Sequence, residues 1–288
     1  MAKGPATGLV NQGATCYMNS LLQSLFMTVD FRQRLYEWAY SGPEKDGAEE
    51  ECIPLQLQRL FARLQLTSRA AVSTKDLTTS FGWTAADAFR QHDVQELCRV
   101  LFDALEDATP DYSIVEELFK GQVEDYLRCS KCGHARSHAD PFLDLELTIA
   151  GCATMEESLR KFVTPETLSG DNMWYCEACA EKVEATKGFV IKSLPTVLTF
   201  HLKRFVYDLS LMRRVKLHDS FEFPATVDMA PFVPTEGDTP SEPQLYDLYS
   251  VMIHTGTAMG GHYFAYVKPP GTSAWLEFND AIVKDLGE

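Results

Sequence analysis

The sequence predicts an α+β fold in which a mainly helical N-terminal part precedes a strand-rich C-terminal part. Before Gly121 the apolar residues recur with helical spacing, and beyond it they alternate with polar residues as in a half-buried strand. Runs of helices followed by runs of strands are typical of the α+β class. The 288 residues are ample for a sizeable core and fit one large domain or two ordinary ones.

Three stretches before Gly121 predict helices. After Thr15, apolar residues recur three, four and seven positions apart, the same spacing returns from Val94 to Leu105, and residues 55–66 form another apolar run. We expect the first helix to begin at Cys16 and to be amphipathic. The acidic stretch 41–51 contains two glycines and a proline, which predicts a solvated loop.

Strands dominate the rest of the chain. Leucine and isoleucine alternate with polar residues over 143–149, which predicts a strand buried on one face. Thr154 and Glu157 have the spacing of a capping box, which predicts one short helix there. The segment 231–243 is rich in proline and is expected to be a loop. Further strands are expected at 197–205, 245–254, 262–268 and 275–278.

The charge balance excludes some classes of function. Lys and Arg number 26 against 41 Asp and Glu, which gives a net charge of −15. Counterion release from a phosphate backbone cannot drive binding by so acidic a chain, so we expect no nucleic-acid partner. If carboxylates converge on one site, the chain would favour a basic surface or a cationic peptide.

No segment has the pattern of a membrane helix or a secretory signal. The stretch 4–29 is free of charge, but Asn11, Gln12, Asn19 and Gln23 interrupt it. The first residues lack the apolar run of a signal peptide. We therefore expect no membrane association and a reducing compartment, cytoplasmic and/or nuclear, in which the eight cysteines are free thiols or metal ligands.

Four cysteines have the spacing of a metal site. Cys129 and Cys132 form one C-x-x-C pair, and Cys176 and Cys179 form a second. Two such pairs complete a tetrahedral thiolate site, for which zinc is the natural ion. A redox pair or ordinary small core residues are the alternatives, but two pairs in a reducing compartment favour zinc. With four protein ligands the site is expected to be structural, and His134 and His138 nearby are expected at the surface.

A nucleophile and its base are the next candidates. Cys16 stands at a helix start, where free amide groups stabilise a thiolate, although a cysteine in that position is more often a buried small residue. His262 follows two glycines that allow a backbone to approach, and Asn279 with Asp280 ends a strand and can orient the imidazole. A structural histidine and a simple turn are the alternatives for these.

These residues lie within motifs that resemble the ubiquitin-specific proteases. Gly-Leu-Val-Asn-Gln-Gly-Ala-Thr-Cys-Tyr-Met-Asn-Ser-Leu-Leu-Gln occupies 8–23, Gln-His-Asp-Val-Gln-Glu-Leu occupies 91–97, Gly-Gly-His-Tyr occupies 260–263 and Phe-Asn-Asp occupies 278–280. Residues 53–61 and 80–83 look most similar to the branch with the herpesvirus-associated enzyme and ubiquitin-specific protease forty-seven. The resemblance covers the chain from Gly8 to its last residue.

The resemblance implies a papain-like cysteine protease with thumb, palm and zinc-bearing fingers. We expect one catalytic domain over 8–288, with the helical thumb at 8–118, the zinc-bearing fingers at 119–188 and the palm at 189–288. Its implied activity is thiol-dependent hydrolysis after the C-terminal glycine of ubiquitin through an acyl-enzyme thioester. One structural zinc per chain and no catalytic cofactor are expected, with ubiquitin and ubiquitinated proteins as partners of a monomer.

The same resemblance assigns roles residue by residue. Cys16 matches the nucleophile, His262 the general base, Asn279 the third triad member, Asp280 a second polar support and Asn11 the side chain that stabilises the oxyanion. Six further residues match positions that hold the cationic ubiquitin tail. They are Trp83, Asp93, Glu96, Tyr207, Gly261 and Tyr263. For the carboxylates a solvated helix face is the alternative, and for the aromatic residues a place in the core.

Two other functions remain as alternatives. A protease for a ubiquitin-like modifier would differ in the charge of the residues that read the tail, and the Asp93 region favours an arginine-rich tail. A thioesterase-type hydrolase fits less well. A non-catalytic ubiquitin-binding scaffold belongs to another class, and the presence of Cys16, His262 and Asn279 argues against it.

Overall fold

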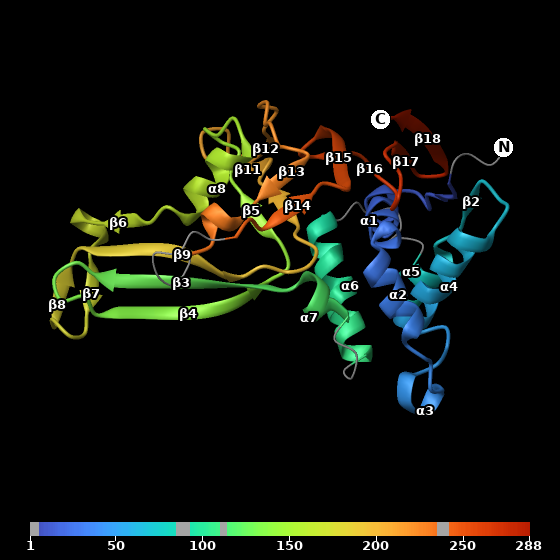
Figure 1. Ribbon diagram of the computed structural model, residues 1–288, viewed down its shortest axis with the longest axis horizontal. Helices are drawn as coiled ribbons and strands as arrows, with labels where there is room; N and C mark the ends of the chain where they lie inside the picture. The colour runs from blue at the N-terminus through green and yellow to red at the C-terminus, as the bar shows by residue number, and fades with distance from the viewer. Residues whose placement is uncertain (1–5, 85–92, 110–113, 235–241) are drawn as a thin grey trace. The chain divides into compact units, whose positions relative to one another are not determined.

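Figure 1 shows a computed structural model of the chain, which describes residues 6–84, 93–109, 114–234 and 242–288. Helices come first and strands later, which confirms the α+β class. The chain forms two compact units: Met1–Leu118 with Tyr249–Glu288, and Phe119–Leu248. Within the described ranges, no helix has the length and apolar content needed to cross a membrane.

The first unit holds most of the helices. They are α1 (Cys16–Met27), α2 (Val29–Glu37), α3 (Pro43–Asp46), α4 (Ile53–Leu66), α5 (Lys75–Ser80), α6 (Val94–Ala108) and, at its end, α7 (Ile114–Phe119). Helix α1 begins at Cys16 as expected, but it is not amphipathic, since all 12 of its residues are buried. The single turn α3 lies where a loop was expected, and its proline occupies a first-turn position that tolerates a missing N–H.

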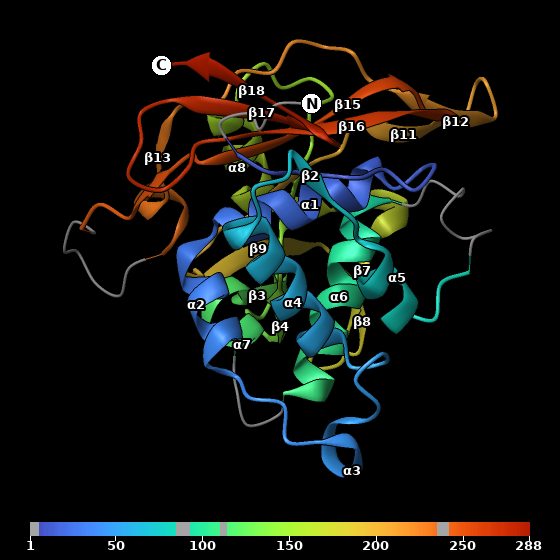
Figure 2. The same ribbon diagram turned by 90° about the vertical axis from the view of Figure 1, so that its right-hand side faces the viewer.

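The strands of the first unit form a small sheet that covers α1. Its order is β15 (Ser250–Thr257), β16 (Gly260–Val267), β17 (Trp275–Asn279) and β18 (Ile282–Gly287), all antiparallel. Figure 2 shows this sheet above the helices, with α1 directly beneath it. A parallel pair joins β1 (Gly8–Leu9) to β2 (Ala71–Val72). Tyr263, Ala265 and Val267 are buried in alternation along β16, against which α1 packs.

Buried polar side chains attach α1 to distant parts of the same unit. Ser24 and Ser250 share a hydrogen bond of 2.7 Å, and Thr28 and Tyr249 share one of 2.8 Å. These bonds explain why Tyr249–Glu288 belongs to the compact unit of the N-terminal helices. The expected division into 8–118, 119–188 and 189–288 stays a prediction.

The second unit is built mainly from strands. Its largest sheet has the order β4 (Ala135–Phe142), β3 (Gly121–Cys129), β9 (Ala185–Ser193) and β6 (Glu166–Leu168). Four strand pairs are separate from it: β5 (Leu145–Leu147) with β10 (Phe200–Leu202), β7 (Trp174–Cys176) with β8 (Glu181–Val183), β11 (Phe205–Asp208) with β12 (Arg213–Lys216), and β13 (Thr226–Asp228) with β14 (Leu245–Asp247). Helix α8 (Met155–Val163) and the 3₁₀ turns η2 (Gly170–Asn172) and η3 (Ala230–Phe232) complete it.

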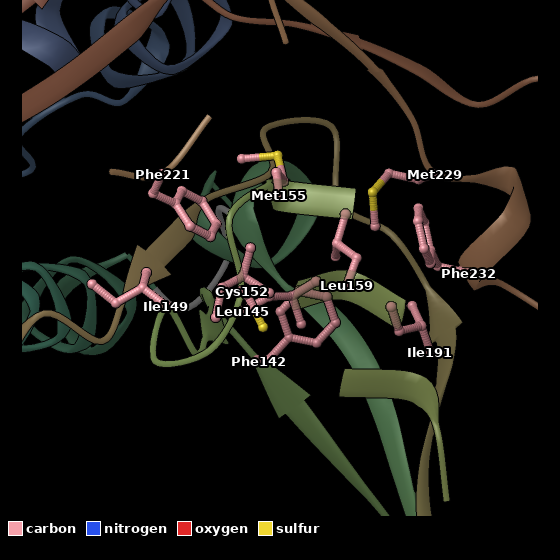
Figure 3. Close-up of a cluster of buried hydrophobic side chains, with 11 residues drawn as sticks. Phe142, Leu145, Ile149, Cys152, Met155, Leu159, Ile191, Phe221, Met229 and Phe232 are labelled. Carbon is pink, nitrogen blue, oxygen red and sulfur yellow. The ribbon is translucent and has the colours of Figure 1, made fainter. Parts of the chain in front are cut away.

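Figure 3 shows the hydrophobic core of the second unit. The alternation predicted over 143–149 is confirmed, because Leu145 and Leu147 are 2% and 0% exposed and point into this core. Helix α8 covers it and begins at a capping box: the Thr154 hydroxyl accepts from the Glu157 N–H at 3.2 Å. The Glu157 carboxylate accepts from the Ala153 N–H at 2.7 Å, one residue before the expected donor.

Candidate functional site

Cys16 begins α1 and lies under the strand that carries His262. Its side chain is 3% exposed, and its Sγ accepts a hydrogen bond from the backbone N–H of Tyr263 at 3.4 Å. Strand β16 pairs with β17 from Ala265 to Val267, so the N–H of Tyr263 lies beyond these register pairs and is free to meet the thiol. The fold therefore places the sulfur directly beside the chain position of His262.

The environment of Cys16 differs from the one expected at a helix start. Burial raises the pKa of the thiol above its ordinary value, the N–H of Tyr263 lowers it less, and the carboxylate of Asp280 raises it further. Desolvation of the charged form outweighs the stabilisation offered by amide groups. The thiol is accordingly favoured over the thiolate, and a base is needed to remove its proton.

The imidazole of His262, the candidate base, is held by Asn279 at the end of β17. The imidazole Nε2 of His262 lies 2.8 Å from Oδ1 of Asn279. Because a carboxamide oxygen only accepts hydrogen bonds, this contact places the imidazole proton on Nε2. Nδ1 is then the basic nitrogen and can receive the thiol proton.

Asp280 follows Asn279 and joins a second set of contacts. Its Oδ2 accepts from Nδ2 of Asn11 at 2.9 Å, and its Oδ1 accepts from Nδ2 of Asn19 at 2.7 Å. The nearest approach of its carboxylate to Nε2 of His262 is 4.0 Å. Asn19 was not a candidate from the sequence, although it lies within the motif quoted over 8–23 and is one of several polar residues in α1.

The carboxamide of Asn11 has a fixed orientation. Its Oδ1 accepts from the N–H of Gly13 at 2.8 Å and from the N–H and hydroxyl of Thr15 at 3.2 and 3.3 Å. Its Nδ2 therefore faces Asp280, which uses one of the two N–H groups. Among the described residues the second N–H has no acceptor, so it can donate to a further oxygen atom.

The close approach of strand β15 leaves no room for a side chain at Gly261. A Cβ atom there would lie 2.0 Å from the carbonyl oxygen of Thr255 and 2.4 Å from Nε2 of His254. This reason differs from the expected one, which was access for a substrate backbone. The ring of Tyr263, which is 8% exposed, lies 4.6 Å from that of His254.

The remaining candidates for tail binding lie in both units. Asp93 is exposed and caps α6, since its carboxylate accepts from the N–H of Gln95 at 2.8 Å. Burial and, second, the charge of Asp93 raise the pKa of Tyr263 to about 12, so this carboxylate acts on the region of Cys16. Glu96 is exposed in the first turn of α6, and Trp83 is half-buried. Tyr207 is 53% exposed on β11 of the second unit.

Residues 91 and 92 of the quoted motif lie outside the described residues.

The four predicted metal ligands meet in the second unit. Cys129 ends β3 and Cys176 ends β7, and all four sulfur atoms lie within 4.8 Å of one another. A tetrahedral ion with Zn–S bonds of about 2.3 Å sets its sulfur ligands about 3.8 Å apart. The observed separations are 3.9 Å for Cys129 with Cys179 and 3.7 Å for Cys132 with Cys176, so the cluster fits one such ion. His134 and His138 are exposed, as expected.

Backbone N–H groups favour the thiolate form of Cys129. Its Sγ accepts from the N–H groups of Cys132 and Lys131 at 3.4 and 3.3 Å. The bond from Cys132 is the main reason why the pKa of Cys129 falls to about 6. Four sulfur atoms this close repel one another once ionised, and a cation removes that repulsion.

Comparison with known proteins identifies one family that matches almost the whole chain and therefore includes both groups of residues. The family described as ubiquitin carboxyl-terminal hydrolase matches residues 7–288. Ubiquitin carboxyl-terminal hydrolase 47 of Xenopus tropicalis is 39% identical over 97% of this chain and 25% of its own length. Ubiquitin carboxyl-terminal hydrolase 15 of Schizosaccharomyces pombe is 41% identical over 95% of this chain and 24% of its own length. The chain thus spans about a quarter of the length of these relatives.

A solved structure supports the same likeness. It is described as the SAGA Ubp8/Sgf11/Sus1/Sgf73 DUB module bound to ubiquitin aldehyde, and it matches with a TM-score of 0.87 and 28% identity. The match covers 98% of this chain and 66% of that chain.

Proposed function

Because this chain belongs to the ubiquitin carboxyl-terminal hydrolase family, we propose that it hydrolyses the isopeptide or peptide bond after the C-terminal glycine of ubiquitin. The relatives carry the name of that activity, and the DUB module in the matching structure is bound to ubiquitin aldehyde. The observation that carries the proposal is the thiol of Cys16 bonded to the backbone N–H of Tyr263, the residue after His262, together with the imidazole of His262 oriented by Asn279. This arrangement is what nucleophilic catalysis by a cysteine requires.

In the proposed reaction, Nδ1 of His262 takes the proton of Cys16, and the thiolate attacks the carbonyl carbon of the terminal glycine. The oxyanion that forms accepts a hydrogen bond from the second side-chain N–H of Asn11. The imidazolium then gives its proton to the leaving lysine amine as the C–N bond breaks and a thioester remains. His262 next removes a proton from water, which attacks the thioester and releases the carboxylate and the thiol.

The cationic tail of ubiquitin is the proposed ligand of the acidic residues near this site. Asp93 and Glu96 lie exposed at the start of α6. Arginine side chains of the tail would pair with these carboxylates, and Trp83, Gly261, Tyr263 and Tyr207 would contact the tail as the family motif implies. The net charge of −15 favours the encounter of the chain with such a substrate.

We further propose that Cys129, Cys132, Cys176 and Cys179 hold one zinc ion. Four thiolates leave no open position for water, so the ion stabilises the second unit and takes no part in catalysis. The reaction above needs no catalytic cofactor. We propose that the chain acts as a monomer in the cytoplasm and/or nucleus, where its free thiols remain reduced.

The test is to treat the chain with ubiquitin that carries a C-terminal electrophile and to map the adduct by mass spectrometry. We expect one adduct, on Cys16, and none on Cys52 or Cys98, which are also outside any disulfide. His262→Ala should slow the reaction, whereas Cys98→Ala should leave it unchanged. Faster labelling by a ubiquitin-like modifier would favour a protease for that modifier, and binding without labelling would favour a non-catalytic scaffold.

A further inference from the structure

We infer that Asn19 is a positioning residue of the active site, which ties the helix of Cys16 to the turn that carries Asn279 and Asp280. The inference rests on the proposed function, because it concerns the geometry of that same site. Asn19 lies three residues after Cys16 on α1, one helical turn along. Its carboxamide reaches a residue 261 positions away, the carboxylate of Asp280.

Asp280 is held from several directions at once. Its two carboxylate oxygens accept from Asn19 at 2.7 Å and from Asn11 at 2.9 Å. Its carbonyl oxygen accepts from the N–H of Leu9 at 2.8 Å. A Cβ on Gly8 would lie 2.6 Å from that same carbonyl oxygen, so β1 runs tightly against this turn. Asp280 adopts a φ of +51°, a left-handed conformation that aspartate tolerates better than most residues do.

The orientation of Asn19 follows from its partner. An ionised carboxylate only accepts hydrogen bonds, so Nδ2 and not Oδ1 must face Asp280. The side chain is 2% exposed, and Oδ1 has no hydrogen-bond partner within the described part of the chain. The bond to Asp280 is therefore the contact that fixes the amide.

The consequence concerns Asn279 and His262. Asn279 is the residue before Asp280, and its Oδ1 sets the imidazole of His262. The carboxylate of Asp280 lies 4.0 Å from His262, beyond hydrogen-bond distance, and its oxygens are engaged by the two asparagines. Asn19 thus acts by positioning other residues. It holds the helix of the Cys16 thiol and the turn that orients the imidazole in a fixed arrangement.

The experiment compares Asn19→Leu with Gln23→Leu in the full chain, using hydrolysis of a fluorogenic ubiquitin C-terminal amide. Gln23 is the matched control, because it lies one turn further along α1, is also 2% exposed and bonds the carbonyl of Thr7 instead of Asp280. We expect Asn19→Leu to lower kcat by about 10²-fold and to leave KM within about twofold, since Asn19 contacts no substrate. Gln23→Leu should leave kcat within about threefold of wild type.

A double variant tests the bond itself. Asn19→Asp places two carboxylates together and should lower kcat at least as much as Asn19→Leu does. Asn19→Asp combined with Asp280→Asn exchanges donor and acceptor and still leaves an acceptor for Asn11. We expect this pair to regain about tenfold in kcat over Asn19→Asp alone. A double variant no better than the worse single variant overturns the inference.

Hydrogen exchange gives a measurement that needs no ubiquitin. The N–H of Leu9, bonded to Asp280, and the amides of 279–282 should exchange faster in Asn19→Leu than in wild type or Gln23→Leu. If wild type fails to turn over ubiquitin, the proposed function fails and exchange still decides the role of Asn19. If wild type is active but Asn19→Leu keeps its kcat and its exchange rates, the positioning role alone is wrong.

Discussion

Cys16, the proposed nucleophile, and the four clustered cysteines of the second unit are placed by different means. In the second unit, one local C-x-x-C pair begins at the end of β3 and the other at the end of β7, and their four sulfur atoms lie within 4.8 Å of one another although the two strands belong to different sheets. In the first unit, Cys16 meets the N–H of Tyr263 across 247 positions, and Asn11 meets Asp280 across 269. The cysteine cluster is thus signalled by two local motifs, whereas the surroundings of Cys16 are built from residues far apart in the sequence.

The two environments also treat sulfur differently. Burial raises the pKa of the Cys16 thiol, so its protonated form is favoured. Cys129 is surrounded by backbone N–H groups that lower its pKa to about 6, as suits a thiolate ligand. The fold therefore favours a protonated thiol at Cys16 and a thiolate at Cys129 within one chain.

Replacement of Cys16 is the change with the largest expected effect on activity. Cys16→Ala removes the nucleophile, so hydrolysis of a ubiquitin C-terminal amide should fall by at least about 10⁴-fold. Binding of ubiquitin, measured by calorimetry, should stay within about twofold, because other residues contact the tail. Cys98→Ala is the control and should retain full activity. Turnover near the wild-type rate in Cys16→Ala would show that Cys16 is not the nucleophile.

Loss of a metal ligand should affect folding instead of chemistry. We expect Cys176→Ser to lose the single zinc ion and at least about 3 kcal/mol of unfolding free energy, part of the ~10–16 kcal/mol apparent for small zinc peptides. The three-residue strands β7 and β8 should open first, since so short a hairpin is unstable alone. Metal analysis and hydrogen exchange measure both effects.

Cys152→Ala is the matched control for that variant. Cys152 is buried in the core of the same unit but lies outside the metal cluster, so its loss should leave the metal content unchanged. A metal-free wild type, or a Cys176→Ser protein with unchanged exchange of β7 and β8, would contradict the structural role of the ion.

The raised pKa of Cys16 predicts a pH dependence. Because burial favours the protonated thiol, the thiolate fraction in the free chain should grow about tenfold per pH unit from pH 7 to 9. The rate of Cys16 alkylation by iodoacetamide, followed by mass spectrometry, should rise in proportion. The zinc-bound cysteines should stay unreactive until a chelator is added. A rate for Cys16 that is flat over this range would show that its thiolate is already formed.

The sequence predicts most of what depends on local spacing. The four metal ligands, the start of α1 at Cys16 and the alternation of Leu145 and Leu147 are of this kind, because each signal lies within a few residues. The amphipathic character expected for α1 is wrong, since the helix packs against both strands and helices and is buried all round. Amphipathic patterning applies to a helix with one solvated face.

Long-range polar contacts are what the sequence does not reveal. The residue-level signal for Asn19 is weak because its partner, Asp280, lies 261 positions away. The resemblance assigns Asp93 to the ubiquitin tail, but not its second role as the N-cap of α6, although aspartate before a helical run is a known cap signal. The first gap is a long-range contact that only the folded chain defines, whereas the second is local, because Asp93 accepts from the N–H of Gln95 two residues on.

Replacement of Asp93 is the change with the smallest expected effect on activity. It tests whether the exposed carboxylates at the start of α6 bind the ubiquitin tail. Asp93→Asn keeps a side chain that caps α6 but removes the charge, whereas Asp93→Ala removes both. Because the carboxylate is exposed, its pairing with an arginine of the tail is worth about 0.2–1 kcal/mol, or up to about a fivefold rise in KM. We expect this rise in both variants, with kcat unchanged, and a smaller rise at high salt because ions screen the pair.

Only Asp93→Ala should also lose about 0.5–2 kcal/mol of stability. If Asp93→Asn leaves KM and its salt dependence unchanged while Asp93→Ala still lowers stability, Asp93 is a helix cap alone, and the acidity of this region plays no part in selecting the substrate.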